Sequence, residues 1–207
     1  MSISLVINAG GESRRMGEPK ALLPVPPSGK PLLRHILDQL TPLVTGVTVV
    51  VLNDQQLVDA LRLGEKVQIV PDAFPDGGPL GGIASGLRFC PGWAIMLACD
   101  MPLVKPALFR YLCSLTRAGT TLDNAGWQAI VPVVGGLPQP FHALYHRQLL
   151  PILEKKLAAG ERRAASFLDE VTTRWVPEAE LRPLDPALHS FVNVNTPEEW
   201  AAACALL

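Results

Sequence analysis

The chain has 207 residues, of which 18 are Lys or Arg and 19 are Asp or Glu, so its formal net charge is −1. This length predicts one compact domain over residues 1–207, and 48% hydrophobic residues provide ample material for its core. A charge balance so close to zero excludes a general attraction to nucleic acid or to a membrane surface, so any anion-binding site must be local.

We expect a cytoplasmic protein without a membrane span. The longest apolar runs, such as 93–99, have the length of a buried strand and not of a bilayer-crossing helix. The apolar N-terminal stretch stops at Asn8 and follows no basic segment, which is not the pattern of a signal peptide. The four cysteines are scattered without CxxC spacing, as expected of reduced, buried thiols.

Strand-like and helix-like segments alternate through the first half of the chain. Short apolar runs predict buried strands at 3–7, 47–52, 67–70 and 93–98. Helical spacing of apolar residues predicts helices at 32–40, 57–63, 82–87 and 108–115. This rhythm indicates crossover units, and therefore an α/β fold with a mainly parallel sheet and helices on both faces.

The second half is less regular. Residues 129–134 predict a strand that enters a tight turn at Gly135 and Gly136. Two helices are predicted at 149–157 and 165–171, and short strands at 173–176 and 191–194. Pro197 is placed to open a C-terminal helix.

The segment 9–20 has the strongest chemical signal. Gly10 and Gly11 directly follow the first strand, so the backbone can turn sharply and bring its N–H groups close to a ligand. Arg14, Arg15 and Lys20 follow within ten residues, and bare amides with fixed cations are what a polyphosphate needs. The pattern is neither G-x-G-x-x-G nor a P-loop. The alternative is a glycine hairpin beside a solvated basic loop.

Asp100 follows a buried strand, at the rim where open α/β sheets bind ligands. Mg²⁺ typically takes one or two protein carboxylates, with waters and phosphate oxygens completing its shell. Pro102 ends the strand and could fix the turn that aims Asp100. The alternative for Asp100 alone is a helix N-cap or a turn, but beside the basic glycine loop a metal site is favoured.

Two further segments suit a ligand. Residues 71–82 form a turn-rich stretch whose glycines could let a flat base lie against exposed backbone, although a flexible surface loop is the alternative. Further on, Thr196, Pro197 and Glu199 form a capping box. That leaves Asn193 and Asn195, which at a spacing of two would point to one side of a strand.

Other polar residues give weaker signals. His142 and His146 have the spacing of a helical metal pair, but Pro140 and the apolar alternation favour a strand, which separates the two side chains. Arg162 and Arg163 are typical of a solvated turn, although a basic pair could also lie near a phosphate site.

In combination these motifs match a family. The run from Ala9 to Leu23, AGG-x-S-x-RMG-x-x-K-x-LL, with GKPLL at 29–33, resembles the opening of small nucleotidyltransferases. Within that superfamily the chain looks most like the molybdenum cofactor guanylyltransferases. GPLGGI at 78–83, CDMP at 99–102, QP at 139–140 and NVNTPE at 193–198 resemble later motifs of that family, in the same order.

The resemblance implies a fold and a reaction. The fold would be a three-layer, doubly wound, mainly parallel sheet of the Rossmann-like nucleotidyltransferase type, with nucleotide bound by about 1–105 and acceptor by about 106–207. The enzyme would transfer GMP from GTP to the phosphate of the molybdenum cofactor, Mo-molybdopterin, with Mg²⁺ as its cofactor. Transient contact with cofactor-delivery proteins or molybdoenzymes would follow from that role.

The resemblance also implies site residues. Arg15, Lys20 and Asp100 would be catalytic, with Asp100 on the metal. Asn193 and Asn195 would line the acceptor side. The nucleotide would be bound by Ala9, Gly10, Gly11, Lys20, Asn53, Asp72, Gly78, Gly82 and Asp100, with the first three on the triphosphate and the stretch from Gly78 to Gly82 on guanine.

The chain departs from the family pattern at three places. Asn8 stands where an apolar residue is common, Pro19 replaces an Asp before the lysine, and residues 26–28 lengthen a linker. The Glu-Pro-Lys version also resembles cytidylyltransferases acting on the same cofactor, but Gly10-Gly11 and the two asparagines favour GTP. Cytidylyl transfer, and a non-catalytic module that binds and delivers the cofactor, are the two alternatives.

Overall fold

The fold is known from a computed structural model that describes residues 2–10, 15–74, 76–116 and 126–207. The strands are β1 (Ile3–Asn8), β2 (Pro24–Val25), β3 (Lys30–Pro31), β4 (Thr48–Val51), β5 (Val67–Val70), β6 (Trp93–Ala98), β7 (Ala129–Val134), β8 (Leu137–Pro138), β9 (His142–His146) and β10 (Thr173–Pro177). The helices are α1 (Leu32–Leu40), α2 (Gln55–Leu61), α3 (Gly78–Leu87), α4 (Pro106–Leu115), α5 (Leu150–Ala158), α6 (Glu178–Leu181) and α7 (Pro197–Cys204).

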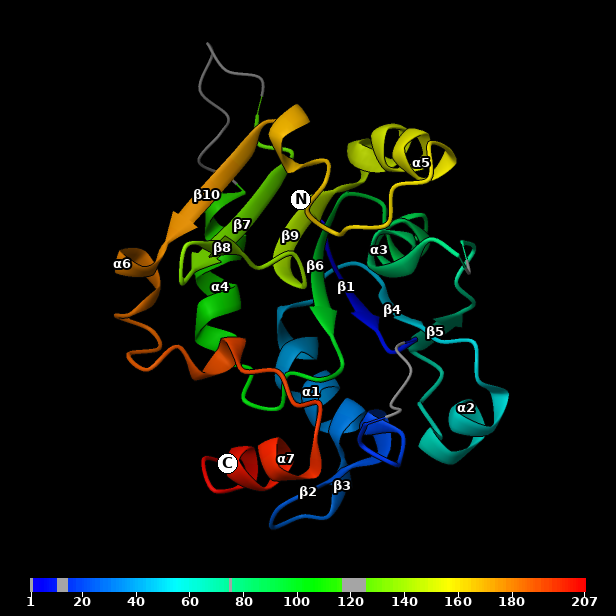
Figure 1. The fold of residues 1–207 in the computed structure, drawn as a ribbon, viewed down its shortest axis with the longest axis vertical. Coiled ribbons are helices and arrows are strands. Elements are labelled where there is room, and N and C mark those ends of the chain that lie inside the picture. Colours follow the sequence, from blue (N-terminus) through cyan, green and yellow to red (C-terminus); the bar gives the residue numbers. More distant parts are fainter. Residues whose placement is uncertain (1, 11–14, 75, 117–125) are drawn as a thin grey trace.

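One twisted sheet runs through the molecule, in the order β10-β7-β9-β6-β1-β4-β5, with β8 paired to β7 (Figure 1). β1 lies between β4 and β6 and is parallel to both, and β5 continues the parallel set beyond β4. β9 is antiparallel to β6 and to β7, while β10 is parallel to β7. The sheet is therefore mixed but mostly parallel, in agreement with the expectation from the alternating segments.

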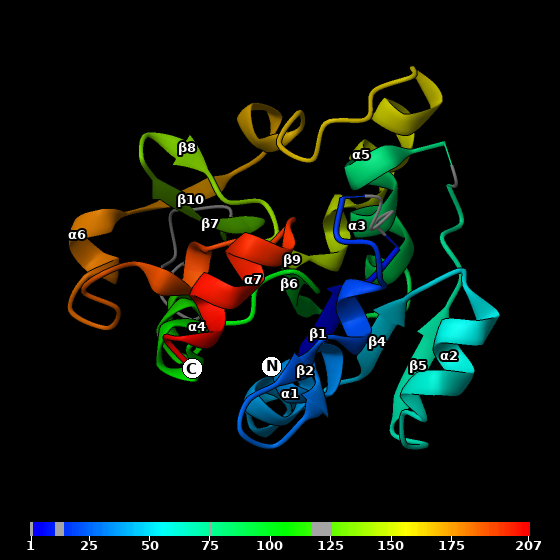
Figure 2. The same ribbon diagram turned by 60° about the horizontal axis from the view of Figure 1, so that its bottom comes forward.

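Helices cover both faces of the sheet, giving three layers (Figure 2). Successive side chains of β1 point to opposite faces, so Leu5 and Ile7 enter one apolar cluster and Val6 enters the other. α1, α2 and α4 pack in the first cluster and α3 and α5 in the second. The first five residues of β1 are buried, and four of these five are apolar, Ser4 being the exception.

Local signals explain where the helices begin and end. In α1 the five buried residues recur at helical spacing, as the sequence predicts. Asp54 caps α2, because its side chain accepts hydrogen bonds from the backbone N–H groups of Gln56 and Leu57. α3 begins at Gly78, earlier than the predicted start at 82.

Two predicted elements are wrong. Residues 165–171 do not form a helix but turns ending in a short 3₁₀ turn, η4 (Leu168–Glu170). The predicted last strand at 191–194 is absent from the described chain there, which forms the 3₁₀ turn η5 (His189–Phe191) and then runs irregularly. Both segments contain buried apolar residues, Phe167 and Leu168 in the first and Val194 in the second, and a short apolar run does not distinguish such irregular chain from regular structure.

Within the described residues, none of the helices combines the length and the apolar character needed to span a bilayer.

Candidate active site

The predicted polar residues follow the carboxyl ends of four neighbouring parallel strands. Gly10 follows β1, Asn53 follows β4, Asp72 follows β5 and Asp100 follows β6. The connections from β1 lead to β4 and β5 on one side, and the chain then returns to β6 on the other side of β1. Such a reversal of strand order leaves a crevice at the carboxyl ends, where α/β sheets bind ligands.

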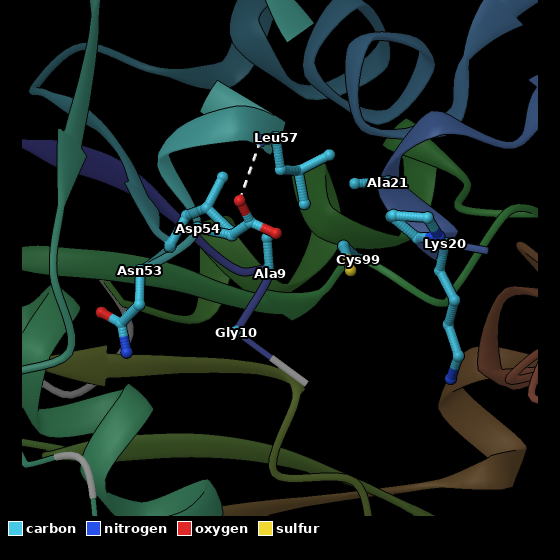
Figure 3. A pocket seen from close by; sticks show the side chains of 10 residues that line it. Ala9, Gly10, Lys20, Ala21, Asn53, Asp54, Leu57 and Cys99 are labelled. Atoms are coloured by element: carbon cyan, nitrogen blue, oxygen red, sulfur yellow. Dashed lines mark hydrogen bonds between the residues drawn. The ribbon is translucent and has the colours of Figure 1, made fainter. Parts of the chain in front are cut away.

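Two adjoining pockets occupy this edge of the sheet, with volumes of about 250 Å³ and about 410 Å³. They share Gly10, Lys20 and Cys99. In Figure 3 Asn53 and Lys20 lie on either side of Gly10 at the first pocket. The first pocket is lined by Ala9, Gly10, Pro19, Lys20, Ala21, Leu52, Asn53, Asp54, Leu57 and Cys99. The second is lined by Asn8, Gly10, Lys20, Asp72, Gly78, Pro79, Ala98, Cys99, Asp100, Met101, Phe141 and Asn193.

Lys20 joins the two ends of the chain at the centre of the site. Its Nζ donates to Oδ2 of Asp100 at 3.2 Å and to Oδ1 of Asn195 at 2.7 Å. The Lys20 and Asp100 side chains retain only 14% and 21% of their exposure, so this pair is poorly screened by water. The ammonium group of Lys20, the carboxylate after β6 and the side-chain amide of Asn195 thus meet at one point.

Asp100 is able to take a further positive partner. Its Oδ1 is buried and accepts no hydrogen bond from the described residues. A buried carboxylate oxygen without a donor is costly, and a cation at this position would remove that cost. One carboxylate combined with phosphate oxygens is a typical set of ligands for Mg²⁺, so the residues present fit that ion.

Asn53 and Asp72 are tied together beside the pockets. Oδ1 of Asn53 accepts the backbone N–H of Asp72 at 2.7 Å. Oδ1 of Asp72 in turn accepts the Ser85 hydroxyl at 2.6 Å and the Phe74 N–H at 2.9 Å. These contacts fix the exits of β4 and β5 relative to α3, so that both side chains are held before a ligand arrives.

Asn8 has a role that its apolar counterpart in the family pattern could not have. Its Oδ1 accepts the N–H of Gly10 at 3.2 Å, and its amide packs directly on Cα of Gly82. A side chain at Gly82 would overlap the Asn8 amide, so the close approach of α3 to β1 requires glycine there. The departure at Asn8 therefore stabilises the first glycine of the loop.

Cys99 borders both pockets but is not a nucleophile. Burial raises the pKa of its thiol to about 12, with the Asp100 carboxylate adding to the rise and Lys20 opposing it. The thiol is therefore protonated at neutral pH, and only a thiolate would attack phosphorus or carbon.

Not every predicted site residue reaches the pockets. Ala9, Gly10, Lys20, Asn53, Asp72, Gly78, Asp100 and Asn193 line them, and Asn195 contacts Lys20. Of the described residues, Arg15 is exposed in a turn outside both linings, and Gly82 is buried against Asn8. Gly11 and Arg14 lie outside the described residues.

The weaker signals are explained by packing. His142 is buried between Phe109 and Phe191, with ring centroids 4.3 and 4.4 Å away, and His146 packs edge-on against Trp93. No group of three His, Cys, Asp or Glu side chains that could hold a metal occurs in the part of the chain that the structure covers. Arg162 lies beside α3, where its carbonyl accepts the N–H of Leu80 at 3.1 Å.

Sequence reasoning missed several lining residues. Leu57 and Phe141 give the pockets apolar walls, and Asp54 lies at the first pocket as the cap of α2. Phe141 follows the Gln139-Pro140 motif directly, which is the signal that could have identified it. Leu57 has no such signal, because it is indistinguishable from a core leucine in sequence.

Comparison with known proteins agrees with this architecture. The model of the MobA-like NTP transferase domain matches residues 5–175. The chain belongs to this family. Its members are nucleotidyltransferases, and a sheet edge that carries Gly10, a lysine and a carboxylate has the groups that such a substrate needs.

Similar proteins cover nearly the whole chain. The molybdenum cofactor guanylyltransferase of Vibrio cholerae is 33% identical over an alignment of 210 residues, covering 98% of this chain and 92% of the relative. That of Syntrophotalea carbinolica is 34% identical, covering 95% of this chain and 88% of the relative. The crystal structure of molybdopterin-guanine dinucleotide biosynthesis protein A from Archaeoglobus fulgidus superposes with a TM-score of 0.80 at 28% identity, covering 98% of this chain and 97% of that one.

Proposed function

We propose that this MobA-like nucleotidyltransferase transfers GMP from GTP to the terminal phosphate of the molybdenum cofactor, giving the guanine dinucleotide form and pyrophosphate. The observation that carries the proposal is the contact of Lys20 with both Asp100 and Asn195. It brings a lysine, a carboxylate and an amide to one point, and the proposal assigns to them phosphate neutralisation, metal binding and the acceptor side. The names of the similar proteins supply the nucleotide and the acceptor.

Charge dominates the barrier of this reaction. An oxygen of the acceptor phosphate attacks the α-phosphorus of GTP, a new P–O bond forms, and the bond to the β-phosphate oxygen breaks with release of pyrophosphate. The attacking oxygen is already ionised, so no general base is needed. Catalysis then rests on positioning the two anions and on neutralising their repulsion.

Lys20 has the central catalytic role. Its side chain is largely withdrawn from water and lies where both pockets meet, so its charge acts on both substrates at low screening. In the proposal it stabilises the charge that develops around the α-phosphate and the departing pyrophosphate. Arg15 stays a prediction as a second cation, because its described position is exposed.

The nucleotide side is built from backbone and amide groups. We place the triphosphate at Ala9 and Gly10, the nucleoside at Asn53 and Asp72, and guanine near Gly78. These residues line the two pockets, and the polar contact between Asn53 and Asp72 holds the sugar-facing wall in place. Gly82 contributes through its packing on Asn8 and not through the base.

Mg²⁺ is the proposed cofactor. Asp100 would hold it through Oδ1, which accepts no hydrogen bond from the described residues, and the ion would supply neutralisation of the triphosphate. On the acceptor side, Asn193 lines the second pocket and Asn195 accepts a hydrogen bond from Lys20, and we place the attacking phosphate beside these two asparagines. Cytoplasmic location and transient contact with cofactor-delivery proteins or molybdoenzymes stay predictions.

The test is a turnover screen with purified protein, molybdenum cofactor and Mg²⁺, in which GTP, CTP and UTP are compared. Pyrophosphate release and mass spectrometry of the extracted cofactor measure the reaction. Product with GTP, at a rate at least about tenfold above that with CTP, supports the proposal. Preference for CTP would identify a cytidylyltransferase, and cofactor binding without pyrophosphate release would identify a delivery module.

A further inference from the structure

The acceptor-side asparagines lie on an irregular segment that must be held by side-chain contacts. Downstream, the segment is fixed by α7, because Oε2 of Glu199 accepts the N–H groups of Asn195 at 2.6 Å and of Thr196 at 3.2 Å. Between the end of α6 at Leu181 and Asn193, where every residue is described, the chain forms only turns and the short 3₁₀ turn η5. Because no helix or strand holds the chain just before Asn193, side-chain contacts have to fix its position.

Asp185 is the polar residue at the start of this segment. Its side chain has 0% exposure, an unusual position for a carboxylate. Oδ2 accepts the N–H of Ser190 at 2.8 Å, which ties the two ends of the turn together. Burial raises the pKa of the Asp185 carboxyl, but hydrogen bonds from Lys105 and Ser190 outweigh burial and hold the pKa below its ordinary value, so the group is ionised.

Lys105 balances the negative charge of Asp185 and lies five residues after Asp100 in the sequence. Its Nζ lies 2.7 Å from Oδ1 of Asp185, and its residue directly precedes α4 at the end of the loop that follows Asp100. A second contact joins the same two segments, because the N–H of Val194 donates to the carbonyl of Asp100 at 2.9 Å. The segment of the asparagines is thus attached twice to the loop of the metal-binding carboxylate.

The turn between these attachments is held in a conformation that a free chain would not prefer. Leu188 has a φ of 55°, in the left-handed region that non-glycine residues rarely adopt. Phe191 is seated on His142, with ring centroids 4.4 Å apart. Such a turn persists only where surrounding contacts determine it. The Asp185 carboxylate makes two of the polar contacts, and Nη1 of Arg182 adds a third by donating to the carbonyl of Pro186 at 2.8 Å.

We propose that Asp185 is a positioning residue for the acceptor-side asparagines. Its carboxylate, paired with Lys105, fixes the turn at 185–192 against the loop that carries Asp100. The direction in which Asn193 faces the pocket and Asn195 faces Lys20 follows from that turn. This inference rests on the proposed function, since it assigns to the turn the placement of the acceptor phosphate.

The experiment compares Asp185→Asn, Lys105→Met and Lys105→Arg in the full chain. Steady-state rates are measured with the molybdenum cofactor varied at saturating GTP, and GTP affinity is measured separately by calorimetry without acceptor. We expect Asp185→Asn and Lys105→Met to lower kcat/KM for the cofactor at least about tenfold, with the Kd of GTP changed less than twofold. Lys105→Arg keeps the charge and is expected to restore at least half of the wild-type value.

The matched control is Lys156→Met, the same substitution in another ion pair, which joins Lys156 on α5 to Glu170 at the end of η4. It is expected to leave kcat/KM for the cofactor within twofold of wild type. Thermal unfolding of every variant shows whether it is folded. Lys105 is partly exposed at its side chain, so Lys105→Met tests the pair even where a change at the buried Asp185 prevents folding.

A double-mutant cycle separates positioning from a general structural role. If Lys105 acts through Asn193, Lys105→Met in an Asn193→Ala background should lower kcat/KM for the cofactor less than twofold. Equal effects in both backgrounds, or a kcat/KM for Lys105→Met within twofold of wild type, would overturn the proposal. Absence of GMP transfer by the wild type would instead overturn the proposed function.

Discussion

Lys20 is the residue at which sequence and structure agree most closely on function. The spacing from Gly10 predicts a cation for phosphate, and the structure places its Nζ on Asp100 and on Asn195. The motif around Asp100 likewise predicts a metal ligand, and its buried Oδ1, which has no donor among the residues that the structure describes, fits that role. Neither residue's motif contained any indication of the contact with Asn195.

Removal of either group should stop turnover while the fold survives. Lys20→Ala and Asp100→Ala each remove a charge that the proposed transition state needs, which is worth at least about 100-fold in kcat. Pyrophosphate release measures the rate, and circular dichroism confirms folding. Lys156→Ala, a lysine in an ion pair on α5, is the control and should keep near-wild-type activity. Wild-type rates for either site variant would remove that residue from the mechanism.

At the level of elements, the site depends on the close contact of β1 with α3. Asn8 ends β1, and its side chain bonds to the N–H of Gly10 while it packs on Gly82. The sequence predicted the glycines as ligand-facing backbone. In the structure Gly82 serves helix–strand packing instead, because the crossover brings α3 against Asn8, a contact between segments more than 70 residues apart.

Gly82→Ala should therefore act through Asn8. The added methyl group displaces the Asn8 amide and breaks its bond to Gly10, so we expect a loss of about 1–2 kcal/mol in the free energy of unfolding. Urea denaturation measures this change. Asn8→Ala together with Gly82→Ala makes room for the methyl group, and the double variant should lose less than the sum of the two single changes. Strict additivity would contradict the mechanism.

The start of α7 could be predicted from capping rules alone. Thr196, Pro197 and Glu199 predict a capping box, and the structure confirms it, with Oγ1 of Thr196 accepting the N–H of Glu199 at 3.3 Å. The same Glu199 carboxylate also accepts the N–H of Asn195. The Glu199 side chain that caps α7 therefore also holds the backbone of Asn195, whose side chain contacts Lys20.

Thr196→Ala should lower the free energy of unfolding by about 1 kcal/mol, the usual cost of a lost N-cap. Chemical denaturation at neutral pH measures it. Thr172→Ala, at an exposed position before β10, is the matched control and should stay within about 0.5 kcal/mol of wild type. An equal loss in both variants would show that the cap is not the cause.

At the scale of the whole molecule, two apolar clusters hold the helices to the sheet, and one of them borders a buried histidine. His142 is fully buried between two phenylalanine rings, and neither ring nitrogen has a hydrogen-bond partner in the described structure. Burial lowers the pKa of His142 from 6.5 to about 3, although the Asp185 charge opposes this shift. The folded protein therefore holds this side chain neutral.

This depressed pKa predicts acid sensitivity. Below about pH 6.5 the unfolded chain binds a proton at His142 that the folded chain does not bind, so stability falls as the pH is lowered, until about pH 3. Between pH 7 and pH 5 we expect this to cost about 2 kcal/mol. Urea denaturation of wild type and of His142→Phe at both pH values tests it. The variant should lose about 2 kcal/mol less, and equal losses would exclude His142 as the source.

The sequence was sufficient for the features that depend on neighbours along the chain. The buried strands β1, β4 and β6, the helix α1 and the cap of α7 are predicted, because burial pattern and capping act over a few residues. The polar residues after successive parallel strands could also be assigned to one edge of a sheet, because carboxyl ends of parallel strands coincide.

The contacts between distant segments required the three-dimensional fold. Lys20 and Asn195 are 175 positions apart, and the antiparallel insertion of β9 between β6 and β7 has no local signature. The irregular path at 191–194 was misassigned for the same reason, since Phe191 packs on His142 and Val194 donates to the carbonyl of Asp100, both partners from distant parts of the chain. Hydrogen-bond and packing partners far along the chain depend on the path of the whole backbone, which no short pattern contains.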